Sequence, residues 1–588
     1  MTPLRIVRRA RDGVAPAWAA VHPVLGRVYA ARGVLHAAEV EHRLASLAPP
    51  AELPGVDAAC ALLAEAIARD RRIVVVGDFD CDGATATAVA VRGLRLLGAR
   101  DAGYRVPNRV RDGYGLSVSL VDALAGDAPD LILTVDNGIS SHAGVAAARA
   151  RGIRVVVTDH HLPGPTLPHA DAIVNPKLAP DADARLGNLA GVGVVFYLLL
   201  ALRARLHPGD RAERDAREAA ALGRVSHKND RPDLAALLDL VALGTVADLV
   251  PLDANNRCLV EAGLKRIRSG RASAGVAALF RAGARDPAHA VASDLGYVLG
   301  PRVNAAGRLD DMRLGIECLL TDDPARADSL ARQLSEINAQ RRELQTAMVE
   351  QGEAMVAAFL ARRGGDALPH GVVLCEEGWH PGVVGLVASK LKERLNRPVV
   401  ACAPAEPGSD ELRGSARSIA GFHLRDALAE VDACRPGLIA RFGGHAMAAG
   451  LTLSRAALPA FAAEFDVVAR RRIEPGSLQR VAWSDGELAA ADFSLELARL
   501  LRYAAPWGQA FPEPLFDNVF DVEAWRPLGE RHLRLGLRVD GAAATLEAVA
   551  FNVATAPPPR ARVLYRLDVD HWNGRERLQL VVHHLEPA

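Results

Sequence analysis

Three short runs in the first third of the chain, at 74–76, 131–135 and 155–157, are apolar almost throughout. Continuous runs of Val, Ile and Leu indicate strands that are buried on both faces, as in a parallel sheet. The Ala-rich stretch 84–97 lies between the first two runs, contains no proline and ends before Gly98. Because strand and helix alternate, the pattern predicts a doubly wound α/β domain.

The pattern changes near residue 322. Asp323-Pro324 is typical of a helix start, because Asp suits the N-cap and Pro suits the first helical position. Apolar residues then recur every three or four positions, which predicts a long connecting helix over 322–363. The run 372–374 predicts the first strand of a second α/β domain over 364–470.

The C-terminal segment alternates polar and apolar residues at 532–539 and 562–569. Alternation predicts antiparallel strands with one solvated face, and a small OB-type β-barrel over 471–588 fits this pattern. Such barrels bind single strands through basic grooves and stacked aromatic rings. The candidates here are Arg534, Arg538, Arg566, Trp525 and Trp572, with core packing an equal alternative for the aromatic residues.

At 588 residues the chain is too long for one hydrophobic core. The predicted fold class is therefore α/β multidomain, with a parallel-sheet domain, a long connecting helix, a second α/β domain and a β-barrel. We expect residues 1–50 to be an extension that packs on the first domain, 51–321. Seven scattered cysteines without a Cys-x-x-Cys pair argue against a disulfide framework and a zinc ribbon.

Charge and hydropathy limit the functional classes. The 70 basic and 70 acidic residues cancel, which argues against a nucleic-acid-binding protein unless basic residues cluster locally, as at 105–111 and 265–271. The N-terminus lacks the apolar core of a signal peptide, and the chain has no run of about 18 apolar residues. We therefore expect no membrane span and a cytoplasmic location.

Acidic residues and histidines follow all three apolar runs. They are Asp78, Asp80, Asp82, Asp136, Asp159, His160 and His161. Ligands of doubly wound sheets bind beyond the carboxyl ends of the strands. In an extended segment Asp78, Asp80 and Asp82 would share one side, where they would repel one another unless a cation neutralised them. A turn or N-cap role explains any one acid, but explains three strand ends together poorly.

Oxygen-rich ligation suits Mg²⁺ or Mn²⁺, and an imidazole ligand favours Mn²⁺. A carboxylate that bridges two ions would give the arrangement used for phosphoryl hydrolysis. The pattern therefore predicts a site for divalent ions that performs metal-assisted chemistry.

The motifs also resemble those of a known superfamily. Asp78-x-Asp80-x-Asp82-Gly83, Asp136-Asn137-Gly138 and Asp159-His160-His161 are similar to the signature motifs of the DHH phosphoesterases, and 242–251, with Asp248, resembles a fourth. Further segments are similar to the RecJ branch of that superfamily. These segments are 28–34, 300–308, 379–382, 414–418, 443–445 and 505–509.

The resemblance implies a single-stranded-DNA-specific exonuclease that works from the 5′ end by two-metal catalysis, in DNA repair and recombination. It implies that Asp78, Asp80 and Asp136 hold one ion, that Asp82, Asp136, His160 and Asp248 hold the other, and that catalysis uses His161, Asp159 and Asp136. His161 would face the scissile phosphate and Asp159 would orient His160. The candidate substrate contacts are Arg109, Arg302, Asn304, Ser415, Arg417 and His445, with salt bridges or a glycine turn as structural alternatives.

By the same resemblance, 51–321 is the catalytic DHH domain, 364–470 the DHH-associated substrate domain and 471–588 the OB-like nucleic-acid-binding domain. The resemblance also implies single-strand-binding protein and a RecQ-type helicase as partners, and we expect a monomer. Two alternatives remain open. One is a DHH phosphodiesterase that acts on oligoribonucleotides or cyclic dinucleotides, and the other is a non-enzymatic repair scaffold.

Overall fold

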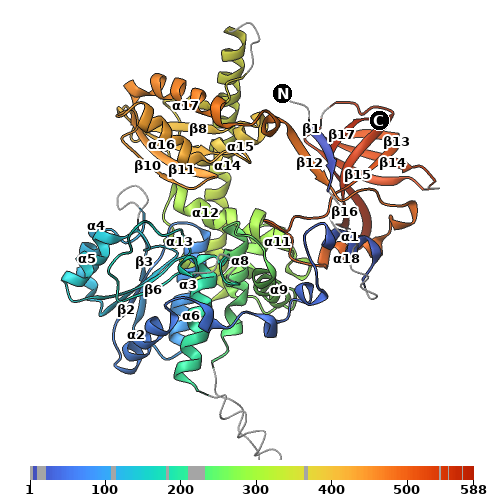
Figure 1. Cartoon of the computed structure of the whole chain (residues 1–588). Coiled ribbons are helices and arrows are strands. Elements are labelled where there is room, and N and C mark those ends of the chain that lie inside the picture. The colour runs from blue at the N-terminus through green and yellow to red at the C-terminus, as the bar shows by residue number, and fades with distance from the viewer. Residues whose placement is uncertain are drawn as a thin grey trace, which may run out of the picture. The chain divides into compact units, whose positions relative to one another are not determined.

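The computed structural model describes residues 4–9, 21–107, 114–179, 185–208, 232–362, 368–541, 544–553, 555–572 and 574–588. The chain divides into two compact units. Helices and strands of both units are labelled in Figure 1. The large unit comprises residues 9–337 and 485–588, and the small unit comprises 1–8 and 338–484. The expected basic cluster at 105–111 lies mostly outside the described residues, as does Arg109.

A parallel five-stranded sheet forms the first part of the large unit. In spatial order its strands are β3 (Ala102–Arg105), β2 (Ile73–Val76), β4 (Leu131–Val135), β5 (Arg154–Thr158) and β6 (Ala172–Val174). The predicted parallel sheet is thus confirmed, and the three apolar runs are its central strands.

Helices cover both faces of this sheet, which explains why its strands are apolar on both sides. Val74, Ile132 and Val155 pack with α4 (Val118–Leu124) and α5 (His142–Ala150). Val75 and Leu133 face the opposite core, which α2 (Val56–Ala68), α3 (Cys81–Leu96) and α6 (Gly191–Leu206) help to form. Burial of each such aliphatic side chain stabilises the fold by ~1.5–3 kcal/mol.

A helical segment follows the sheet in the large unit. Its helices are α8 (Leu238–Ala247), α9 (Ala254–Arg268), α10 (Ala274–Ala282), α11 (Ala292–Asp294), α12 (Gly300–Leu309) and α13 (Arg313–Leu320). The basic residues at 265–268 on α9 pair with acids of the same unit, since Arg268 Nη1 lies 3.2 Å from Glu261 Oε1 and Arg266 Nε lies 4.0 Å from Asp239 Oδ1. These arginines therefore stabilise the fold, which favours the structural interpretation of that cluster.

The long helix α14 (Pro324–Arg362) confirms the predicted connecting helix almost to the residue. Asp323 Oδ1 accepts a hydrogen bond from Ala325 N at its start, as an N-cap residue does. The boundary between the two units falls within α14, after Ile337.

The small unit contains a second, mixed sheet. Its strands, in spatial order, are β10 (Arg441–Gly444), β11 (Ala448–Ser454), β9 (Glu411–Arg417), β8 (Val399–Pro404) and β7 (Val372–Cys375). Its helices are α15 (Val384–Leu395), α16 (Leu424–Cys434) and α17 (Leu458–Arg472). Only β7 and β8 pair in parallel, and the remaining pairs are antiparallel.

A closed five-stranded barrel completes the large unit, in the order β13, β14, β15, β17, β16. The strands are β13 (Phe516–Leu528), β14 (His532–Val539), β15 (Leu546–Phe551), β16 (Arg560–Trp572) and β17 (Arg575–Pro587), and α18 (Leu495–Tyr503) precedes them. Phe516, Phe520 and Tyr565 fill its interior, whereas Trp525 is 47% exposed. The predicted barrel is confirmed, and Trp525 lies on its surface.

The N-terminal extension contacts the first domain, where Asn255 Oδ1 accepts a hydrogen bond from Ala48 N, but it also contacts two other segments. Strand β1 (Leu4–Arg8) pairs in parallel with β12 (Arg480–Ser484) of the small unit. Helix α1 (Pro23–Ala30) instead contacts the C-terminal segment, where Tyr29 donates a hydrogen bond to the Ala504 carbonyl. Both partners are more than 400 residues away in sequence, so a local pattern does not reveal them.

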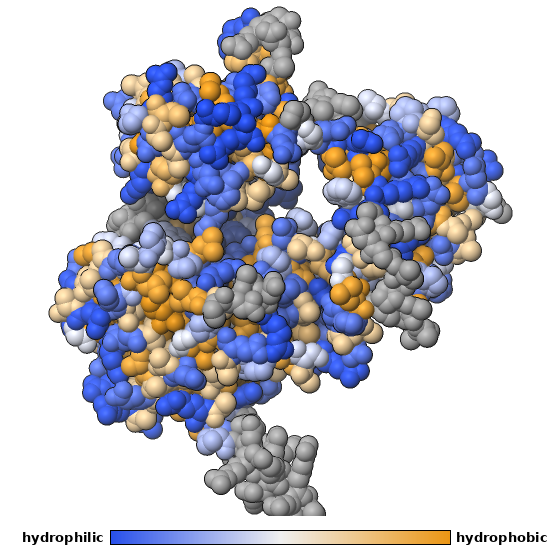
Figure 2. Space-filling model, in the orientation of Figure 1, coloured by the Kyte–Doolittle hydropathy of each residue, from blue (hydrophilic) through white to orange (hydrophobic). Residues whose placement is uncertain are grey.

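Hydrophilic and hydrophobic residues are interspersed over the visible faces of both units (Figure 2). Within the described ranges, none of the helices is both long and apolar enough to cross a bilayer.

Candidate metal centre

The first acidic segment forms the turn from β2 into α3. Asp80 is the N-cap of α3, and its Oδ1 accepts a hydrogen bond from Gly83 N at 2.9 Å. Asp82 lies in the first helical turn, so the expected extended arrangement of the three acids was wrong. A Cβ on Gly83 would lie 2.6 Å from Asp78 Cβ, which explains the glycine at this position by close approach.

The three acids are divided between two clusters of potential ligands. Asp78 and Asp80 approach Asp136, whereas Asp82 approaches His160 and Asp248, with ligand atoms within 4.8 Å of one another in each cluster. Asp248 directly follows α8. The resemblance implied similar ligand sets, with Asp136 in both, and the assignment of ions to these sets stays a prediction.

Asp82 is fixed by the N-terminus of α6. Its Oδ2 accepts from Gly191 N at 2.6 Å and its Oδ1 accepts from Val192 N at 2.9 Å. Burial and the charge of Asp80 raise the pKa of Asp82 to about 7, although these backbone hydrogen bonds oppose the rise. The carboxylate is therefore held in place but is costly to ionise without a nearby cation.

Asp136 occupies the position immediately after β4 and has a left-handed backbone with φ of 62°. Left-handed geometry is unfavourable for most non-glycine residues and concentrates at functional sites. Gly191 packs against this residue, because a Cβ there would lie 2.5 Å from Asp136 Cβ. The fold therefore holds the Asp136 carboxylate in one orientation.

The contact between Asp136 and His160 tests whether metal fits this centre. Asp136 Oδ1 lies 3.1 Å from His160 Nε2, and both atoms are buried without a hydrogen-bond partner in the described part of the chain. His160 Nε2 also lies 3.6 Å from Asp248 Oδ2 and 3.9 Å from Asp82 Oδ2. An orphaned imidazole nitrogen surrounded by carboxylate oxygens is a donor set that fits a divalent ion.

The electrostatics of the protein atoms agree with this fit. Burial, followed by the charge of Asp82, raises the pKa of Asp136, and the same two causes raise that of Asp248. Burial, followed by His161, lowers the pKa of His160 to about 3, which keeps this ring neutral and able to ligate. Divalent ions would remove the repulsion between the carboxylates.

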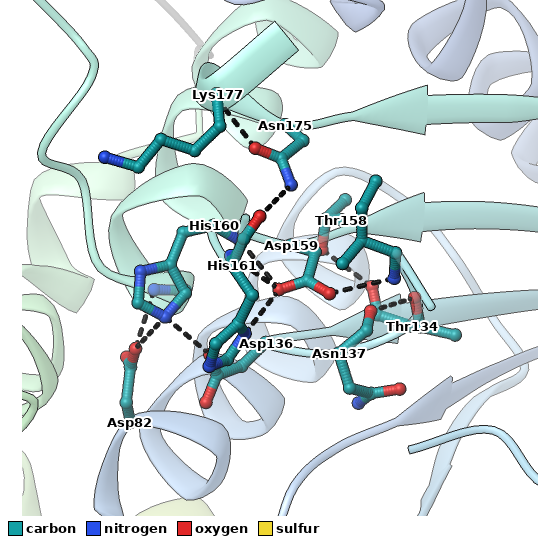
Figure 3. A network of polar contacts seen from close by, with 12 residues as sticks. Asp82, Thr134, Asp136, Asn137, Thr158, Asp159, His160, His161, Asn175 and Lys177 are labelled. Carbon is teal, nitrogen blue, oxygen red and sulfur yellow. Dashed lines mark hydrogen bonds and ion pairs between the residues drawn. The ribbon is translucent and has the colours of Figure 1, made fainter. Parts of the chain in front are cut away.

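His161 belongs to a different hydrogen-bond network (Figure 3). Its Nδ1 lies 2.7 Å from Asp159 Oδ1, which also accepts from the backbone N–H groups of His160 and His161. Asp159 therefore orients the ring of His161, rather than that of His160 as expected. Burial lowers the pKa of His161, but the hydrogen bond and charge of Asp159 outweigh burial and raise it overall.

Tyr114 and Asn175 complete this network, and sequence reasoning missed both. The Tyr114 hydroxyl lies 3.2 Å from His161 Nδ1 and donates to the Asp136 carbonyl at 3.1 Å. Asn175 Nδ2 donates to the His161 carbonyl. Asn175 directly follows β6, so the pattern of polar residues at strand ends could have predicted it. Tyr114 lies in a loop, where that pattern gives no prediction.

Two predicted substrate contacts are already engaged by the protein. Arg302 donates to Ser335 Oγ at 3.0 Å and to the Val298 carbonyl at 2.5 Å. Asn304 Oδ1 accepts from Cys81 N at 2.8 Å, at the start of α3. These bonds favour the structural alternative for Arg302 and make Asn304 a positioning residue for the acidic turn.

Three further predicted substrate contacts, Ser415, Arg417 and His445, lie in the small unit. Arg417 Nη1 donates to Ser415 Oγ at 3.0 Å, and both side chains lie close to Gly385 at the start of α15. Burial lowers the pKa of the Arg417 guanidinium. His445 is exposed after the β10 strand and its backbone N–H bonds to the Ala448 carbonyl. Ser415 and Arg417 thus form one group, while His445 lies at a hairpin turn.

Comparison with known proteins places the chain in a family. The N-terminal domain model of the DHH family matches residues 72–245, the DHHA1 domain model matches 368–470 and the RecJ OB domain model matches 484–584. The single-stranded-DNA-specific exonuclease RecJ of Dickeya dadantii is 50% identical over 570 residues, which are 96% of each protein. The chain belongs to the RecJ family.

Other RecJ proteins are similar to this chain in sequence and structure over nearly its whole length. RecJ of Escherichia coli is 47% identical over 99% of each protein. The crystal structure of Thermus thermophilus RecJ in complex with Mn²⁺ superimposes with a TM-score of 0.76 at 33% identity, over 97% of this chain and 76% of that one. The Mg²⁺ complex of the same protein has a TM-score of 0.71.

The carboxyl pKa values predict how ion binding depends on pH. Without ions, the raised pKa of Asp82 means that stability falls as pH rises from about 4 towards 7, because the folded state retains the proton. Mn²⁺ must displace such protons, so its stabilising effect should grow over the same range. We expect the Mn²⁺-induced rise in Tm to be larger at pH 8 than at pH 5.5, measured by differential scanning fluorimetry. A larger Mn²⁺-induced rise in Tm at pH 5.5 than at pH 8 would contradict the assignment of Asp82 as an ion ligand.

Proposed function

We propose that this chain hydrolyses single-stranded DNA from the 5′ end, as a metal-dependent exonuclease of the RecJ family. The observation that carries the proposal is the orphaned pair of Asp136 Oδ1 and His160 Nε2, 3.1 Å apart between two ligand clusters. Mg²⁺ or Mn²⁺ is the proposed cofactor, since the site is rich in carboxylates and RecJ structures of Thermus thermophilus contain these ions.

The geometry described above divides the proposed ligands into two sets, one for each ion. Asp78, Asp80 and Asp136 would hold one ion, and Asp82, Asp136, His160 and Asp248 would hold the other. When bound, two ions supply Lewis-acid activation of water and stabilisation of the leaving oxygen. Asp136 serves both sets, which requires the fixed orientation that its left-handed backbone and Gly191 impose.

The surroundings of His161 favour its cationic form, which could act on the phosphate. Asp159 raises the pKa of this ring against the effect of burial, so the cationic form persists to higher pH than that of free histidine. A cationic ring beside the ligand clusters would stabilise negative charge that develops on the phosphate oxygens. We therefore assign His161 a direct role and Asp159 and Tyr114 positioning roles.

A labelled oligonucleotide tests the proposed activity. Single-stranded DNA labelled at its 3′ end is incubated with the protein and Mg²⁺ or Mn²⁺, and the products are resolved over time. Progressive shortening from the 5′ end is expected, and blunt duplex of the same sequence should resist. Cleavage of cyclic dinucleotides or oligoribonucleotides but not of long single strands would instead support the alternative DHH phosphodiesterase.

Two exposed large side chains that line one cavity suggest how bases are held. Leu249 follows Asp248, is 65% exposed and has φ of 63°, and Tyr297 is 81% exposed. Both line a cavity of about 260 Å³ together with Trp507 and Gln509. Tyr297 lies in a π-helical turn, Leu295–Leu299, and such turns are frequent at functional sites.

We expect Tyr297→Ala to weaken binding of single-stranded DNA about tenfold, because stacking of a base on an aromatic ring contributes ~1–3 kcal/mol. Tyr297→Phe keeps the ring and should bind as the unmodified protein does. Fluorescence anisotropy with a labelled oligonucleotide, in Ca²⁺ to prevent cleavage, measures both affinities. Equal affinities for the Ala and Phe variants would show that Tyr297 does not stack on the bases.

The partners implied by the resemblance, single-strand-binding protein and a RecQ-type helicase, remain proposals, as does a monomeric state. Arg109, Ser415, Arg417 and His445 likewise remain proposed contacts for the DNA backbone.

A further inference from the structure

A second group of potential metal ligands lies in the large unit, outside the catalytic centre. It comprises His289, His571 and Glu576, each of which offers a ligand atom within 4.8 Å of the others. His289 ends the turn Pro287–His289, whereas His571 and Glu576 are directly paired across the β16–β17 hairpin. The group therefore joins the helical segment of the large unit to the barrel.

The contacts within this group hold its two rings and its carboxylate close together. His571 Nδ1 lies 3.4 Å from Glu576 Oε1, and the rings of His289 and His571 are stacked with centroids 4.1 Å apart. His571 Nε2 is buried and has no hydrogen-bond partner in the described ranges. A buried, unpartnered imidazole nitrogen costs stability unless a ligand satisfies it.

Residues of α18 hold two members of the group in place. Arg499 donates from both Nε and Nη2 to Glu576 Oε2, which directs Oε1 toward His571. The Tyr503 hydroxyl lies 3.4 Å from His289 Nδ1. Partners of this kind orient the ligands of many metal sites. The nearby cation Arg502 is paired with Asp568 at 2.7 Å, so its charge is largely compensated.

We propose that His289, His571 and Glu576 bind a third divalent ion, Zn²⁺, which clamps the barrel hairpin to the helical segment. Two imidazoles and one carboxylate, with water in the fourth position, form a donor set that Zn²⁺ accepts and that Mg²⁺ disfavours. The side chains are 40%, 26% and 29% exposed, so the ion can enter from solvent. A link between segments so distant in sequence stabilises the folded unit.

The test uses the full chain with Asp82→Asn and Asp136→Asn, which disables the catalytic centre. After removal of metals by chelation, Zn²⁺ is added alone, and bound ion is counted by native mass spectrometry. One Zn²⁺ per chain is expected, together with a rise in Tm. Adding His571→Gln, or separately His289→Gln, should abolish both effects, while His584→Gln on the same hairpin should abolish neither.

Substitution of Co²⁺ gives a second readout that does not depend on stability. A site with imidazole ligands should show visible d–d absorption in the catalytic-centre variant, and His571→Gln should remove it. Absence of bound Zn²⁺ in that variant would overturn the proposal. So would Zn²⁺ binding that persists in both His→Gln variants.

Discussion

Asp136→Asn is expected to reduce exonuclease activity by about a thousandfold or more, because it removes the one carboxylate that both proposed ion sites share. The substitution preserves the shape of the side chain, and asparagine tolerates the left-handed backbone observed here with φ of 62°. Initial rates on single-stranded DNA in saturating Mn²⁺ measure the effect.

A measurement of Tm distinguishes this loss of activity from a loss caused by misfolding. Burial and Asp82 raise the pKa of Asp136, so an ionised carboxylate at this position destabilises the metal-free protein. At pH 8 the metal-free variant should therefore have an equal or higher Tm than the metal-free unmodified protein, and Mn²⁺ should raise it less.

Asp130→Asn is the matched control. Asp130 lies at the amino end of β4, opposite Asp136, and accepts hydrogen bonds from Arg72 N and Arg71 Nη1. It should retain near-normal activity. Substantial activity in Asp136→Asn, at the level of Asp130→Asn, would show that this carboxylate does not bridge the ions.

The sequence alone was sufficient to predict which residue types lie at the carboxyl ends of the strands. Continuous apolar runs identified β2, β4 and β5, and strand ends of a parallel sheet necessarily meet at one edge. The helix signal at Asp323-Pro324 was equally local, so α14 was predicted within two residues of its observed ends.

The predictions from sequence that differ from the structure concern the directions in which side chains point. Period-two spacing suggested that three acids share one side, but the N-cap bond of Asp80 starts α3 early and turns Asp82 toward α6. Arg302 was assigned to phosphate because arginine suits that role, whereas the Ser335 hydroxyl on α14 and the Val298 carbonyl, four residues earlier, engage it. Such partners are chosen by tertiary packing, which no local pattern records.

The pairing of Asp159 with His161 is a further example, and it has a measurable consequence. Adjacent histidines have equivalent local sequence, yet one ring points at carboxylates of the ion clusters and the other at Asp159. Asp159 is itself buried and also accepts a hydrogen bond from Ile139 N at 2.9 Å. It is therefore a rigid acceptor that holds the proton of His161.

We expect Asp159→Asn to lower activity about a hundredfold, since loss of the partner misorients and deprotonates His161. The raised pKa of His161 means that its cationic form is present at low pH and lost as pH rises through that pKa. In the variant the alkaline limb of the pH–rate profile should therefore move to lower pH, while the acid limb, set by the carboxylates, should stay in place. Asp171→Asn is the control, because Asp171 Oδ2 likewise accepts a backbone hydrogen bond, from Val155 N. A slower variant whose alkaline limb does not move would mean that Asp159 supports the fold and not the charge of His161.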